Sequence, residues 1–180
     1  MRKLEAWLYM TLDGVVEAPE NWVMPDEQMF EEQTAGYAES DALLLGRRTY
    51  VVFAASWPQR GSDVPNAEWM NSTRKYVAST TLESPGWQNT TVLDGDAREA
   101  VSRLKQEDGK TITLNGSATL LRSLLGAGLV DELRIFLHPV VLGSGYRLFD
   151  STGDRVALEL ADSHAYDNGV VALSYQPARR

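Results

Sequence analysis

Strand-like and helix-like segments alternate along most of this sequence, and that alternation restricts the possible folds more than any other feature. Short apolar runs typical of buried strands are expected at residues 4–10, 41–45, 75–78, 90–93, 111–114 and 133–137. Segments rich in helix formers separate several of these runs and are expected at residues 26–37, 47–55, 97–107 and 117–125. Because parallel strands need a crossover connection, this order predicts an α/β fold with a mostly parallel sheet covered on both faces.

The C-terminal part of the chain follows a different pattern. Residues 157–161 and 170–175 suit two antiparallel strands joined by a tight turn at Asp167 to Gly169. We therefore expect the sheet to end in an antiparallel hairpin at one edge. A chain of 180 residues is long enough to bury one substantial core, so we expect a single domain over residues 1–180.

Composition excludes several classes of function. The chain has 17 basic and 25 acidic residues, a net charge of −8 that argues against a nucleic-acid or anionic-membrane partner. It has no cysteine, and its two histidines, His138 and His164, lie far apart without a third ligand, so we expect no metal site. No apolar run is long enough for a signal peptide or a membrane helix, which favours a cytoplasmic location. His138 ends an apolar strand, where a packed or hydrogen-bonded role is expected.

The first candidate binding motif is the junction Gly46-Arg47-Arg48-Thr49, between the strand at 41–45 and the helix that follows. The glycine permits a tight turn, the threonine can cap the helix, and the arginines place positive charge where a phosphate would lie. The alternative is a plain turn that carries two solvated arginines.

The second candidate is Asn115-Gly116-Ser117-Ala118-Thr119, where small residues follow a strand and open a helix. Such a turn can hold a pyrophosphate on backbone amides, although it can also be only a tight connection. It matches neither the Walker nor the Rossmann motif. Ser79-Thr80-Thr81 follows the strand at 75–78 and offers hydroxyl donors or merely a turn. Two anion sites on neighbouring strands would suit a dinucleotide with a second phosphate, as in NADPH.

These segments together resemble the dihydrofolate reductase superfamily, and most closely the reductase domain of the bacterial riboflavin-biosynthesis deaminase–reductase. The resemblance rests on Thr11-Leu12-Asp13-Gly14, Leu44-Leu45-Gly46-Arg47-Arg48-Thr49-Tyr50, Asn115-Gly116-Ser117, Leu129-Val130-Asp131-Glu132-Leu133 and Pro139-Val140-Val141-Leu142-Gly143. It implies a three-layer sandwich and an NADPH-dependent hydride transfer to a small heterocycle, such as a pyrimidine or a pterin. Members of this branch are often dimers, so we expect a homodimer.

The resemblance also implies roles for individual residues. Arg47 is the best match for the ribose phosphate, and an Asp13 loop borders the nicotinamide. The residues implied to hold the cofactor are Thr11, Gly14, Gly46, Arg47, Arg48, Thr49, Ser79, Thr80, Asn115, Gly116, Ser117, Ala118 and Thr119. Phe30 and Gly143 are expected at the substrate, and Asp13, Asp26 and Glu27 are the candidate catalytic acids.

The substrate residues match the family less closely. In dihydrofolate reductases an acidic side chain holds the pterin, two residues after a proline and four residues before a phenylalanine. Counting from Pro25 gives Glu27, whereas counting from Phe30 gives Asp26. Both acids can equally be a charged helix start. The position of the family's threonine falls at Leu137 or His138, which counts against dihydrofolate reduction. No zinc ligands of a deaminase domain are present, which fits a free-standing reductase. Two alternatives stay open: a non-catalytic NADPH- or nucleotide-binding protein, and a flavin-binding module.

Overall fold

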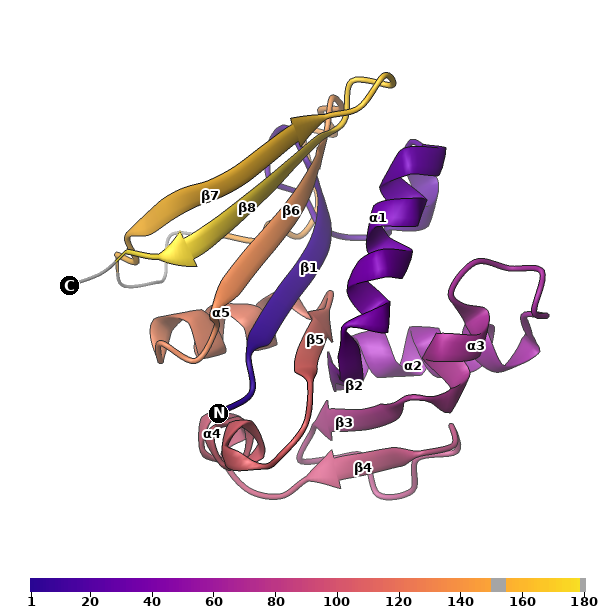
Figure 1. Ribbon diagram of the computed structural model, residues 1–180, viewed down its shortest axis with the longest axis vertical. Coiled ribbons are helices and arrows are strands. Elements are labelled where there is room, and N and C mark those ends of the chain that lie inside the picture. The colour runs from indigo at the N-terminus through magenta and orange to yellow at the C-terminus, as the bar shows by residue number, and fades with distance from the viewer. Residues whose placement is uncertain (150–154, 179–180) are drawn as a thin grey trace.

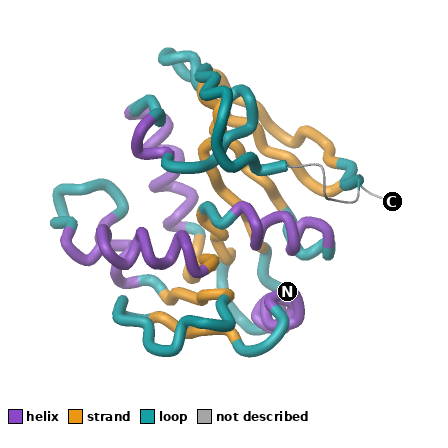
Figure 2. The backbone as a smooth tube through the Cα atoms, turned by 180° about the vertical axis from the view of Figure 1, so that it is seen from behind, coloured by secondary structure: helices purple, strands orange, loops and turns teal. Residues whose placement is uncertain are grey.

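The computed structural model describes residues 1–149 and 155–178, in which helices pack on both faces of an eight-stranded sheet (Figure 1, Figure 2). The strand order across the sheet is β4-β3-β2-β5-β1-β6-β8-β7. The strands are β1 Leu4–Thr11, β2 Ser40–Gly46, β3 Arg74–Ala78, β4 Thr90–Leu93, β5 Thr111–Asn115, β6 Glu132–His138, β7 Leu158–Ala165 and β8 Val171–Pro177. β1 to β6 pair in parallel, and β8 is antiparallel to both of its neighbours. The predicted mostly parallel sheet with an antiparallel C-terminal edge is confirmed.

The helices form the two outer layers. They are α1 Glu27–Ala38, α2 Arg47–Ser56, α3 Ala67–Ser72, α4 Ala97–Gln106 and α5 Ala118–Gly126. Successive side chains of a strand point to opposite faces, and β1 shows the consequence. Leu4, Ala6 and Leu8 pack with α4 and α5, whereas Trp7 packs with α1, α2 and α3. This arrangement is the predicted three-layer sandwich.

Two elements differ from the sequence-based expectation. The short helix α3 was not predicted, because it has only six residues and starts after Asn66, which has a left-handed backbone (φ 64) in place of an ordinary cap. The strand expected at 157–161 runs on to Ala165 as β7. Its register shifts between Leu160 and Asp162 and most of its residues are exposed, so apolar alternation does not mark its full length.

The order of the strands decides where a ligand can bind. β2, β5, β1 and β6 are neighbours and run in the same direction, so their carboxyl ends meet at one edge of the sheet. Helices α2 and α5 begin at that edge, directly after β2 and β5. In open α/β sheets, this is the edge at which ligands bind.

Candidate functional site

The two predicted junctions touch each other. The Gly46 amide donates a hydrogen bond to Ser117 Oγ at 2.6 Å. Thr49 Oγ1 accepts hydrogen bonds from the Ser117 amide at 3.1 Å and from Ser117 Oγ at 2.8 Å. A Cβ on Gly46 would lie 3.0 Å from Ser117 Oγ, and one on Gly116 would lie 3.3 Å from Thr49 Cγ2. The chain therefore brings the starts of α2 and α5 together, and both glycines allow the close approach.

Both helices begin without a side-chain cap. Neither Gly46, before α2, nor Ser117, before α5, accepts a hydrogen bond from the first turn with its side chain. The first amides of a helix have no partner within the helix, and they carry the positive end of its dipole. Gly116 and Ser117 both have left-handed backbones, with φ of 66 and 54, which turns the chain sharply into α5. Two uncapped N-termini side by side are suited to bind anionic groups.

Arg47 and Arg48 add positive charge at the same place. Both side chains are exposed in the first turn of α2, which contains no acidic residue. Within residues 1–149 and 155–178, neither guanidinium has a hydrogen-bond or ion-pair partner. Cations at a helix N-terminus are unfavourable by about 0.3–1 kcal/mol each, because they face the positive end of the dipole. A bound phosphate would remove this repulsion.

Ser79 and Thr80 follow β3, whose Ala78 is paired with Gly46 of β2. Ser79 Oγ accepts from the Thr81 amide at 3.2 Å and from the Leu82 amide at 3.0 Å, so it stabilises a turn. Thr80 is exposed. The turn-forming role is thus present, and the Ser79 hydroxyl hydrogen remains available to a ligand beside Gly46.

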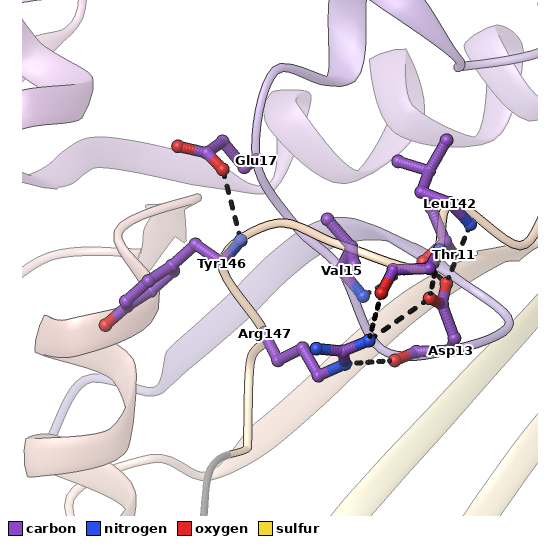
Figure 3. Close-up of polar contacts among 8 residues, drawn as sticks. Thr11, Asp13, Val15, Glu17, Leu142, Tyr146 and Arg147 are labelled. Atoms are coloured by element: carbon purple, nitrogen blue, oxygen red, sulfur yellow. Dashed lines mark hydrogen bonds and ion pairs between the residues drawn. The ribbon is translucent and has the colours of Figure 1, made fainter.

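Asp13 anchors one loop to the end of β1 (Figure 3). Its carboxylate accepts from Thr11 Oγ1 at 2.7 Å and from the Gly143 amide at 2.9 Å, and it forms an ion pair with Arg147 Nη2 at 3.4 Å. The Thr11 hydroxyl, followed by the amides of Leu142 and Gly143, lowers the pKa of Asp13 to about 2. Arg147 Nε also donates to the Asp13 carbonyl at 2.9 Å. Asp13 is therefore ionised at neutral pH and ties together two loops far apart in the sequence.

The two other candidate acids lie at the start of α1. Asp26 is its N-cap, and the carboxylate accepts from the Met29 amide at 3.0 Å. Glu27 is exposed in the first turn, and its side chain has no hydrogen-bond or ion-pair partner in the part of the chain that the structure describes. Phe30 is half-buried against an apolar cluster that includes Met29 and Phe136. The helix-start role is thus observed for Asp26, whereas Glu27 is unengaged.

His138 lies at the end of β6, paired with Thr11 of β1. It is fully buried, and its Nδ1 accepts from the Met24 amide at 3.3 Å. The rings of Tyr9 and Trp22 meet it edge-on, each with a centroid distance of 5.5 Å. Burial lowers the pKa of His138 to about 4, so the imidazole is neutral. Leu137 packs in the opposite layer, with the α4 and α5 core, so His138 and not Leu137 faces the layer of α1.

Several residues near the site were not among the predicted ones. Arg147 pairs with Asp13, and the Tyr146 amide donates to Glu17 Oε2 at 3.1 Å (Figure 3). A shallow depression of about 290 Å³ borders this loop and is lined by Val15, Glu17, Ala18, Asn21, Trp22, Leu142, Ser144 and Gly145. The glycine-rich run at 143–145 is the only sequence signal near these contacts.

The described residues include neither a candidate metal site nor a membrane-spanning helix. Residues 1–149 and 155–178 contain no group of three or more His, Asp or Glu side chains placed to hold a metal ion. None of the helices within those ranges is long and apolar enough to cross a membrane.

Comparison with known proteins identifies the family. The sequence pattern of the RibD C-terminal domain matches residues 2–172. The chain belongs to the RibD C-terminal domain family. It is 32% identical over 180 residues to the Uncharacterized protein YyaP of Bacillus subtilis (strain 168), a match covering 97% of this chain and 94% of YyaP.

Solved structures of other proteins have the same fold. A protein from Shewanella sp. PV-4 named for riboflavin biosynthesis superimposes with a TM-score of 0.79 and 19% identity, over 98% of this chain and 99% of that one. A pyrimidine reductase-like protein from Corynebacterium diphtheriae gives a TM-score of 0.68 and 15% identity, over 99% and 93% of the two chains. The dihydrofolate reductase-like fold predicted for this RibD C-terminal domain is confirmed.

Proposed function

We propose that this RibD C-terminal domain is an NADPH-dependent reductase that transfers a hydride to a small heterocyclic substrate. The observation that carries the proposal is the contact between two uncapped helix N-termini, bridged by Thr49 and Ser117. Two arginines that have no side-chain partner among the described residues flank this contact. NADPH has a pyrophosphate and a separate phosphate on the adenosine ribose. One dinucleotide would therefore fill both anion sites. The family membership supports a reductase of this kind.

Each part of the junction suits one group of the cofactor. The amides that follow Gly116 and Ser117 at the start of α5 would hold the pyrophosphate. Arg47 and Arg48 would hold the ribose phosphate, for which a guanidinium offers paired donors. Ser79 would add a hydroxyl on the next strand. When bound, NADPH supplies the hydride, so the protein has to bind and orient both reactants.

The residues at the end of β1 would shape the reaction site. Asp13 is ionised and holds the loop that carries Gly143, so its role in the proposal is to fix that loop. A proton delivered to the substrate would come from Glu27 or from an ordered water. Glu27 is preferred to Asp26 because the Asp26 carboxylate is engaged with the Met29 amide.

A non-catalytic NADPH- or nucleotide-binding protein is the second candidate. Trp22 is only 8% exposed, and its ring covers His138 at the end of β6. If Trp22 keeps this place when the cofactor binds, no substrate reaches the end of β1. The protein would then retain the anion sites without a reaction.

A binding titration tests the proposal. The dissociation constants of NADPH and NADH are measured from tryptophan fluorescence, followed by NADPH oxidation at 340 nm with pyrimidine and pterin substrates. The proposal predicts tighter binding of NADPH than of NADH, and oxidation that depends on the heterocycle. No binding at millimolar NADPH would reject it, and tight binding without oxidation would favour the second candidate.

A further inference from the structure

Apart from Trp7 Nε1, two buried side-chain N–H groups on the α1 side of the sheet have no acceptor within residues 1–149 and 155–178. They are His138 Nε2 and the side-chain Nε2 of Gln33, on residues that are 0% and 6% exposed. Tyr9 of β1 lies between them: its hydroxyl donates to Gln33 Oε1 at 2.9 Å, and its ring meets that of His138. Buried donors are normally paired, so two unpaired ones beside the same tyrosine need an explanation.

The hydrogen bonds of the two residues make both groups donors. The Met24 amide donates to His138 Nδ1, so in the neutral imidazole the hydrogen lies on Nε2. The Gln33 oxygen accepts from Tyr9, which leaves the Gln33 NH₂ group free. A ligand that satisfies both groups must present two acceptors, such as ring carbonyls or unprotonated ring nitrogens.

The surroundings favour a flat and uncharged ligand. Aromatic side chains of Tyr9, Trp22, Phe30 and Phe136 stand around the two donors. The nearby carboxylate of Glu32 is already paired with Arg134 at 2.7 Å and with the Tyr166 hydroxyl. No unpaired cation faces the donors from these elements in the described chain, so a neutral heterocycle fits better than an anion.

The segment from Trp22 to Pro25 covers His138. Long hydrogen bonds join Met24 and Pro25 to the rest of the molecule: the Met24 amide to His138 Nδ1 at 3.3 Å, and Asn168 Nδ2 to the carbonyls of Met24 at 3.2 Å and Pro25 at 3.3 Å. Trp22 Nε1 donates to the Glu17 carbonyl at 2.7 Å, so a ligand has to break one short bond to displace the ring. The depression beside the Asp13 loop reaches the other side of Trp22. A ligand that displaces Trp22 would therefore reach His138 directly from this depression.

We propose that His138 and Gln33 are the specificity-determining residues of the substrate site, and that they recognise a neutral heterocycle through two acceptors. The proposal rests on the proposed reductase function and names the substrate class for that site. Both groups are donors, so the substrate edge that they meet is an acceptor edge.

The second histidine provides a matched control. His164 Nε2 is also buried without a partner among the described residues, and its ring packs edge-on against Tyr166 at 4.7 Å. It lies on β7, two strands away from β6, with no second unpaired donor beside it. A group that is merely buried would behave like His164, whereas a recognition group would respond to ligand.

The test uses the full chain labelled with ¹⁵N-histidine, in which two histidines give two sets of signals; the variant His164→Gln assigns them. The free protein should show His138 protonated on Nε2. Uracil and lumazine, which carry ring acceptors, should shift the Nε2–H proton downfield. Phenol and 2-naphthol, flat rings without a ring acceptor, should leave it unchanged.

Affinity measurements on variants complete the test. His138→Leu and Gln33→Met should each weaken binding of the responsive heterocycle by about tenfold or more, and His164→Leu should not. Gln33→Met keeps the test decisive if His138→Leu fails to fold. The proposal is overturned if neither heterocycle shifts the His138 signal, or if the carbocyclic rings shift it equally.

NADPH binding is measured on the same samples to separate the two proposals. Bound NADPH with no response of His138 to the heterocycles overturns the present inference alone. A response of His138 without any NADPH binding supports recognition of the heterocycle and overturns the proposed reductase.

Discussion

Replacing Thr49 by valine removes the oxygen that joins the two helix starts and leaves the side-chain shape almost unchanged. Thr49 Oγ1 accepts two hydrogen bonds, from the Ser117 amide at 3.1 Å and from Ser117 Oγ at 2.8 Å. Each is worth about 0.5–1.5 kcal/mol, so Thr49→Val should reduce the free energy of unfolding by about 2 kcal/mol. For a chain of this size that lowers the melting temperature by about 4–8 °C.

The same substitution should weaken NADPH binding by about tenfold, because Ser117 loses the Thr49 oxygen, which accepts from its amide and hydroxyl and helps to hold its left-handed backbone at the start of α5. Urea unfolding gives the stability and fluorescence titration the affinity. Thr49→Ser keeps the oxygen and should keep most of both. Thr34→Val is the matched control, because Thr34 Oγ1 donates only to the Phe30 carbonyl on the exposed face of α1. Equal stability and affinity in Thr49→Val and Thr49→Ser would refute the reasoning.

Three further predictions follow from the same structure. Gly116→Ala should lose about 1–2 kcal/mol of stability, because φ at this residue is 66, and it should also bind NADPH more weakly. Gly128→Ala, at φ 68 with open space around it, should lose only stability; equal losses of NADPH affinity in the two variants would contradict the role of the close contact between Gly116 and Thr49. The free energy of unfolding in urea should fall by up to about 3 kcal/mol as pH drops from 6.5 to 4, because burial puts the folded pKa of His138 at about 4 and the unfolded chain binds more protons in that window. His138→Leu should reduce this pH dependence, and an unchanged slope in the variant would contradict the assignment to His138. The Asp13 carboxylate has a pKa of about 2 instead of 3.8, so it should protect the Gly143 amide from hydrogen exchange down to about pH 4, because the stabilising effect of the carboxylate is lost only as pH falls through the folded pKa. Exchange of this amide should be faster in Asp13→Asn, and loss of protection in the wild type above pH 4 would contradict the prediction.

Local sequence patterns were sufficient to predict the mostly parallel sheet and the two junctions at the ends of its strands. The alternation of apolar runs and helices fixed the strand directions, and the direction of β2 and β5 placed Gly46 and Gly116 at one edge. Their contact also requires that β2 and β5 be neighbours in the sheet. Sequence periodicity does not give the order of the strands, so this part of the site is known only from the structure.

Contacts made by backbone groups across the sequence could not be predicted. Asp13 is anchored by the amides of Leu142 and Gly143, which carry no side-chain signal and are separated from it by about 130 residues in the chain. The choice between Leu137 and His138 at the threonine position depends on register, since a shift of one residue exchanges the faces of a strand. The homodimer and the single-domain organisation stay predictions.

The most direct measurement of the central claim is the dissociation constant of NADPH for the wild-type chain and for the double variant Arg47→Gln/Arg48→Gln. The control is Arg60→Gln, an exposed arginine that packs over the Trp57 ring at 4.3 Å, away from the junction. We predict that the double variant binds NADPH at least about tenfold more weakly and retains its weaker binding of NADH, and that Arg60→Gln matches the wild type. Equal NADPH affinity in all three proteins, or no binding by the wild type at millimolar cofactor, would contradict it.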